Sequence, residues 1–148
     1  MVNPFDLRTV VLARHAQHVI LIHFPIALFI AGVGLDLLSR GKRDSQLAGA
    51  AYWNLSLAAA AVLPTLLTGI LAWQFALEGQ KLKGLLLMHI IAASFAAVLV
   101  IASWWVHWRS RRAEPLVLPR YRLPLELLGV VILGLSAHLG GFLTGVNS

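Results

Sequence analysis

Residues 84–108 read GLLLMHIIAASFAAVLVIASWWVHW, a run without Asp, Glu, Lys or Arg. A helix needs about 20 such residues to cross the hydrocarbon core of a membrane. Three further windows have similar length and character, at about 16–39, 51–77 and 123–146. The pattern predicts an all-α integral membrane protein, a four-helix transmembrane bundle that residues 1–148 form as a single domain.

The overall composition agrees with a membrane location. The 148 residues are 59% hydrophobic and 12% charged, whereas soluble domains average roughly 45–50% and 25%. The net charge of +6 does not indicate nucleic-acid binding, because the basic residues form short clusters between apolar runs instead of one patch. A water-soluble globule is therefore excluded, and we expect membrane lipid as the main surroundings.

The basic residues also predict the orientation of the bundle. Segments 40–43 and 109–122 carry eight Lys and Arg, whereas the N-terminal arm and segment 78–83 carry four. Lys and Arg concentrate on the cytoplasmic side of short loops. We therefore expect a multi-pass membrane protein with both termini outside.

Histidines are the most informative polar residues. The chain has no cysteine, which excludes thiolate metal sites and covalent c-type haem attachment. His23, His89 and His138 lie at similar depth in the outer half of three predicted helices, His18 lies further out, and His107 lies at the opposite end. Ionisable residues inside a membrane are functional candidates. Small residues follow His23, His89 and His138 at helical spacing, so we expect all three to point into the bundle.

This outer histidine layer allows several interpretations. Haem b takes two histidine nitrogens from facing helices as axial ligands, and an outer position also suits a quinone. Alternatively, the histidines form hydrogen bonds between helices. A histidine metal site is a further alternative, for which a nearby carboxylate or a third imidazole is expected.

Carboxylates and catalytic motifs are scarce. Asp36 is expected to pair with Arg40, four residues later on the same helix, and Glu126 falls in the first turn of the last helix, where the helix dipole favours it. The sequence contains no Gly-rich phosphate loop, no Gly-x-Ser-x-Gly elbow and no HExxH motif. We expect no independent enzyme, at most an electron-transfer subunit.

Residues 18–28, HVILIHFPIAL, resemble a family of small bacterial four-helix membrane proteins known as domain of unknown function 2231. The family opens with a similar His-Pro-x-x-x-His-Phe-Pro-x-Ala-Leu segment followed by an aspartate, here Asp36. Val19 stands where the family usually has proline. Similarity continues at 68–73, at His89 and at 140–146, so it covers roughly the whole chain.

The resemblance implies a location in the bacterial inner (cytoplasmic) membrane and a redox setting, because members of the family look like companions of electron-transfer proteins and some are joined to cytochrome c-like domains. His18, His23 and His89 match the family pattern by position. If haem is present, we predict His23 and His89 as the ligands of the haem iron. His138 is then an alternative ligand, or a hydrogen-bond partner of a propionate or quinone.

Together these features predict a small integral subunit of a bacterial respiratory or photosynthetic electron-transfer complex. It holds haem b or a quinone in the outer histidine layer and contacts other membrane subunits, a cytochrome c-like protein among them. One alternative is a non-redox structural or assembly subunit whose histidines serve helix–helix contacts. A transporter for a small solute or metal is less favoured, since the sequence shows no inverted repeat.

Overall fold

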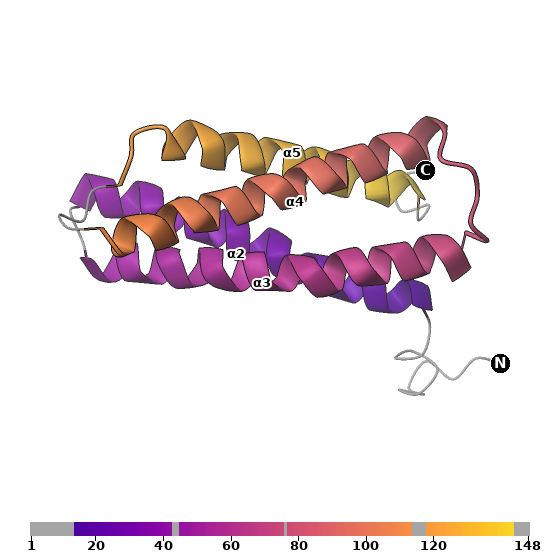
Figure 1. Cartoon of the computed structure of the whole chain (residues 1–148), viewed down its shortest axis with the longest axis horizontal. Coiled ribbons are helices and arrows are strands. Elements are labelled where there is room, and N and C mark those ends of the chain that lie inside the picture. The colour runs from indigo at the N-terminus through magenta and orange to yellow at the C-terminus, as the bar shows by residue number, and fades with distance from the viewer. Residues whose placement is uncertain (1–13, 43–44, 76, 114–117, 144–148) are drawn as a thin grey trace.

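Four long helices make up the described part of the chain. The structure, a computed structural model, describes residues 14–42, 45–75, 77–113 and 118–143. In these ranges it contains α-helices and no strand, and each helix is long and apolar enough to cross a membrane. This confirms the predicted all-α fold with four spans. The helices are α2 (Arg14–Lys42), α3 (Ser45–Phe75), α4 (Gly84–Arg111) and α5 (Arg122–Leu143) (Figure 1).

The helix ends differ from the predicted windows. Helix α3 begins at Ser45, ahead of the predicted start near residue 51, and α4 continues past 108 to Arg111. A hydropathy window marks the apolar stretch, whereas the helix itself continues through polar residues until the backbone turns. Between α3 and α4 that turn includes Gly79 and Gly84, both with positive φ, which glycine adopts at no steric cost. The predicted end of the last span, residues 144–146, lies outside the described residues.

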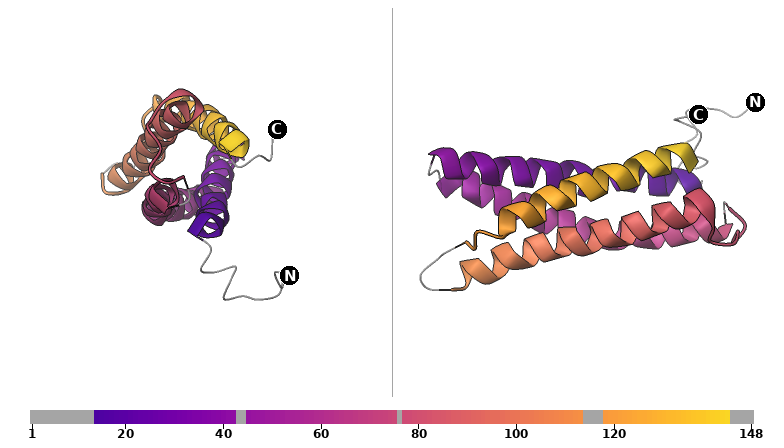
Figure 2. Two further views of the ribbon diagram at one scale, coloured as in Figure 1. Left: turned by 90° about the vertical axis from the view of Figure 1, so that its right-hand side faces the viewer. Right: turned by 90° about the horizontal axis from the view of Figure 1, so that it is seen from above.

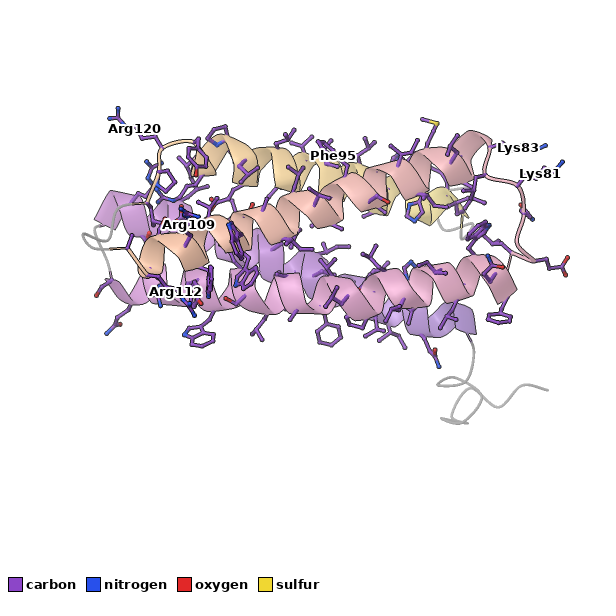
Figure 3. All side chains as sticks on the ribbon, in the orientation of Figure 1. Lys81, Lys83, Phe95, Arg109, Arg112 and Arg120 are labelled. Carbon is purple, nitrogen blue, oxygen red and sulfur yellow. The ribbon has the colours of Figure 1, made fainter. Side chains whose placement is uncertain are left out.

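The helices pair into two hairpins, α2 with α3 and α4 with α5. Seen along the bundle, the four helices occupy the corners of a square, with α2 diagonally opposite α4 (Figure 2). Arg109, Arg112 and Arg120 lie at one end of the bundle, which we call the arginine end, and Lys81 and Lys83 lie at the other, the lysine end (Figure 3). Helices α2 and α4 finish at the arginine end, where α3 and α5 begin.

The apolar core lies where the hairpins meet. Its fully buried members include Phe29 of α2, Leu55 of α3 and Val100 of α4. Phe29 lies so close to α5 that a Cβ atom added at Gly129 would come within 2.7 Å of its Cζ. The outer surface is also apolar, as expected for helices that face lipid. It includes Trp53, Leu63, Leu67, Ile91, Phe95, Val98 and Val131.

The two hairpins follow one sequence pattern at an interval of 71 residues. Identical residues recur at this interval between α2 and α4 and between α3 and α5. Three of the identical pairs named below are polar or charged. The identical pairs include His18 and His89, Phe24 and Phe95, Leu28 and Leu99, Ile30 and Ile101, Ala31 and Ala102, Ser39 and Ser110, Arg40 and Arg111, and Gly69 and Gly140.

Burial repeats with the same interval. Most buried residues of α2 have buried counterparts in α4, and half of the buried residues of α3 have buried counterparts in α5. The pairs are Pro25 and Ala96, Phe29 and Val100, Gly32 and Ser103, Asp36 and His107, Ser39 and Ser110, Ala51 and Arg122, Leu55 and Glu126, and Ala58 and Gly129. Both hairpins therefore run in the same direction through the bundle. The two hairpins therefore form a parallel repeat and are related by an axis along the bundle. A parallel repeat is compatible with the absence of an inverted repeat from the sequence.

Substitution of Gly129 tests the close contact between α2 and α5. We expect Gly129→Ala to destabilise the protein by about 1–3 kcal/mol, because the new methyl group overpacks against the buried Phe29 ring. Thermal unfolding in detergent measures the change. Gly134→Ala on the same helix is the matched control, since a Cβ there meets nothing within 4 Å. Equal losses in both variants would contradict the close contact of Phe29 with Gly129.

Candidate functional site

Four charged or ionisable side chains are buried together at the arginine end. They belong to Asp36 of α2, His107 of α4, and Arg122 and Glu126 of α5. These four residues are 0%, 3%, 5% and 0% exposed, in that order. We call these four side chains the charged cluster. Buried charges are costly unless they are paired and hydrogen-bonded, so the cluster depends on the contacts among its members.

Arg122 and Asp36 form a bidentate ion pair. The Arg122 Nε donates to Asp36 Oδ2 and its Nη2 donates to Oδ1, both at 3.0 Å. This paired geometry is the strong form of a carboxylate–guanidinium contact. It also links the first hairpin to the second. The prediction that Asp36 pairs with Arg40 is wrong, because Arg40 is exposed and the start of α5 brings Arg122 onto both oxygens of Asp36.

His107 and Glu126 form the second contact of the cluster. The His107 Nε2 lies 2.7 Å from Glu126 Oε1. The other carboxylate oxygen of Glu126, Oε2, is buried and has no hydrogen-bond partner within the described residues. Asp36, His107 and Glu126 each offer one potential metal-ligand atom, and these three atoms lie within 4.8 Å of one another. The chemistry of this set suits a bound cation or a shared proton.

The sequence pattern alone indicates no function for the charged cluster. It separates His107 correctly from the outer histidines, but it predicts local helix-end roles for Asp36 and Glu126. One signal was available: the small-residue face that starts at His89 reaches Ser103, and one more turn along that face is His107. Ser103 is itself buried.

His18 and His89 occupy equivalent places in the two hairpins. The Nδ1 of His18 lies 3.3 Å from Thr68 Oγ1, and its ring lies on Gly69, where a Cβ would come within 3.0 Å of Cε1. The Nδ1 of His89 donates to the carbonyl of Ser136 at 3.0 Å. Its ring lies on Gly140, the repeat counterpart of Gly69, with a corresponding approach of 3.1 Å. Each histidine therefore joins the two helices of its own hairpin.

His23 and His138 lie elsewhere. Both are exposed on the bundle surface, so the prediction that they point into the bundle is wrong. The His23 Nδ1 donates to the carbonyl of Val19 on its own helix at 2.7 Å, and the His138 ring packs edge-on against Phe142. The buried face of α2 runs through Phe29 instead of through the small residues that follow His23, because the bulky ring fills the core and the alanines face outward.

These features define the class of the protein. It is an integral membrane protein with four apolar helices that pack as two hairpins around a buried charged cluster. Residues 14–146 match the family described as "Predicted membrane protein (DUF2231)", and the chain belongs to this family. The resemblance found in the sequence is thereby confirmed. None of the curated proteins and none of the solved structures matches the chain.

A double-mutant cycle tests the ion pair between the hairpins. We expect Asp36→Asn and Arg122→Gln each to lower the free energy of unfolding by about 3–5 kcal/mol, because each leaves a buried charge without its partner. The double variant should lose less than the sum of the two. Denaturing-detergent titration of the folded protein measures all three. Arg120→Gln, an exposed arginine nearby, is the control and should change stability by less than about 0.5 kcal/mol.

Proposed function

We propose that the protein is a small integral subunit of a bacterial respiratory or photosynthetic electron-transfer complex, and that its histidines at the lysine end hold haem b or contact a quinone. The observation that supports this proposal is the hydrogen bonding of His23 and His89. Both rings donate their Nδ1 proton to a backbone carbonyl, at 2.7 Å and 3.0 Å.

This hydrogen bond selects a form of the imidazole that suits metal binding. A neutral ring that carries its proton on Nδ1 has an unprotonated Nε2, and metal-ligating histidines usually donate their other nitrogen to a carbonyl or carboxylate. Within the described residues neither His23 nor His89 makes a second hydrogen bond. Haem b, when bound, would supply one-electron transfer, and His23 and His89 remain the first proposed ligands. His18, the repeat counterpart of His89, is the alternative partner.

Exposure of two histidines supports the role of a subunit. His23 and His138 lie on the outside of the bundle, where a polar ring would otherwise face lipid. Covering them with another membrane subunit or with a cofactor is more favourable, because polar groups in hydrocarbon are costly. Proposed partners are therefore other subunits of the complex, a cytochrome c-like protein among them, with His138 as a hydrogen-bond partner of a propionate or quinone.

An absorption spectrum tests the haem proposal. We expect the detergent-purified protein to show a b-type α-band in the dithionite-reduced minus oxidised spectrum, stoichiometric with the chain. His89→Ala and His23→Ala should each abolish it, because each removes a residue proposed to hold the haem iron. Ser94→Ala is the matched control, since Ser94 stands at the repeat position of His23. An unchanged band in both histidine variants would rule out the proposed ligands.

A scaffold without a redox cofactor is the second candidate. It is favoured by the contacts of His18 with Thr68 and of His89 with Ser136, which join helices within each hairpin. Such contacts are worth about 1 kcal/mol in membrane proteins. A flat spectrum from folded protein, with loss of stability in His89→Ala, would select the scaffold over the cofactor-binding subunit.

We further propose that the protein lies in the bacterial inner membrane with its arginine end in the cytoplasm and both termini outside. The larger number of Lys and Arg at that end supports this orientation. Because the chain has no cysteine, single cysteines report topology without background. In intact spheroplasts, a membrane-impermeant maleimide should label Lys81→Cys and leave Arg120→Cys unlabelled until the membrane is opened. The reverse pattern would invert the orientation.

A further inference from the structure

The charged cluster has the composition and spacing of a metal site. We propose that Asp36, His107 and Glu126 bind one divalent transition-metal ion, of which Zn²⁺ is the representative, and that this ion joins the two hairpins. The site lies at the arginine end and is separate from the outer histidines, so it does not depend on the haem or quinone proposal.

The distances between the donor atoms support this proposal. A metal ion bound at about 2.0–2.2 Å from nitrogen and oxygen ligands places adjacent ligand atoms roughly 3 Å apart. The His107 Nε2 and Glu126 Oε1 are already 2.7 Å apart, and the donor atom of Asp36 lies within 4.8 Å of both. To close the set around one ion, the Asp36 donor atom has to approach the other two to roughly 3 Å. The ion takes the place of the proton between His107 Nε2 and Glu126 Oε1, which is released to the solvent, and His107 binds the ion as a neutral imidazole with its remaining proton on Nδ1.

The second oxygen of Glu126 is the independent sign of a missing ligand. Oε2 is buried and lacks a hydrogen-bond partner within the described residues, and Glu126 itself is 0% exposed. Leaving a buried acceptor unsatisfied typically costs about 1–3 kcal/mol, and more when the group is charged. A bound cation would satisfy this oxygen.

The type of ligand selects the type of ion. Mg²⁺ and Ca²⁺ prefer oxygen ligands alone, whereas imidazole combined with carboxylates suits Zn²⁺ and the neighbouring first-row metals. Three protein ligands with a fourth position left to the solvent is a common arrangement for Zn²⁺. The site therefore fits a transition metal better than an alkaline-earth ion.

Arg122 fits this arrangement as a support for the ligand Asp36. Each carboxylate oxygen has more than one lone pair, so Asp36 can keep both hydrogen bonds from Arg122 and still bind the ion. Ligating carboxylates are commonly held by such a donor. When His107 binds the ion as a neutral imidazole, the charges of Asp36, Glu126 and Arg122 leave the four side chains with one net negative charge. A divalent ion together with one small anion from the solvent brings the total to zero.

The parallel repeat explains why the described residues form one such site and not two. Asp36 and His107 stand at equivalent positions of the two hairpins, but the counterparts of Glu126 and Arg122 in the first hairpin are Leu55 and Ala51. Only the second hairpin therefore supplies the additional ligand Glu126 and the supporting Arg122. That set takes one ligand from α2 and two from the second hairpin, so a bound ion would connect the two halves of the bundle.

Metal analysis of the purified full chain, without an affinity tag that binds metal, tests the proposal. We expect about one Zn²⁺ per chain after equilibration with Zn²⁺ and removal of excess, and a higher unfolding temperature with the ion than after chelation. Glu126→Gln should weaken binding by about 100-fold or more, since changes to supporting residues alone typically cost about 10–100-fold. Glu78→Gln, an exposed glutamate, is the matched control and should bind like the wild type.

A second variant identifies the ligand directly and covers the case in which Glu126→Gln does not fold. His107→Cys places the only cysteine of the chain at the site, and a thiolate is itself a good ligand for Zn²⁺ and Co²⁺. With Co²⁺ this variant should show a sulfur-to-cobalt absorption band that the wild type lacks. Folded wild-type protein that binds none of Zn²⁺, Mn²⁺ or Fe²⁺ would overturn the proposal. Metal retained at full stoichiometry by folded Glu126→Gln, or no sulfur-to-cobalt band in folded His107→Cys, would overturn it as well.

Discussion

The bidentate contact between Asp36 and Arg122 is the interaction on which the arrangement of the hairpins depends. Inside a membrane the lipid tails are as apolar as the helix surfaces, so burial of leucine does not by itself bring helices together. Close packing and polar links have to do so. The ion pair and the contact of Phe29 with Gly129 both connect α2 to α5, and they fix which helices of the two hairpins are neighbours at the arginine end.

The two ends of the bundle use polar groups differently. At the arginine end the ion pair of Asp36 and Arg122 joins one hairpin to the other, whereas at the lysine end His18 and His89 bond within their own hairpins. A cofactor or partner that entered between the hairpins at the lysine end would therefore leave the charged cluster intact. The charged cluster and the outer histidines can serve separate purposes in one small protein.

The sequence predicted the four helices because an uncharged apolar run of 20 residues or more is typical of a membrane span, but it could not predict pairings between distant residues. Asp36 and Arg122 are 86 positions apart, and only the packing of α5 against α2 brings them together. The expectation that a face of small residues points into the bundle was right for the face of α4 that leads to Ser103. It was wrong for α2, where Phe29 fills the core and the alanines face outward, because small residues occur on both kinds of surface.

The parallel repeat bears on how an unsymmetric charged cluster can evolve. Two identical hairpins associated as a symmetric dimer would place residue 36 of each near the same residue of its copy, so an aspartate there would face an aspartate and a histidine would face a histidine. Joining the hairpins in one chain removes this constraint. Each position then varies alone. One hairpin can carry Asp36 while the other carries His107, Arg122 and Glu126, and no dimer of identical hairpins could form this combination.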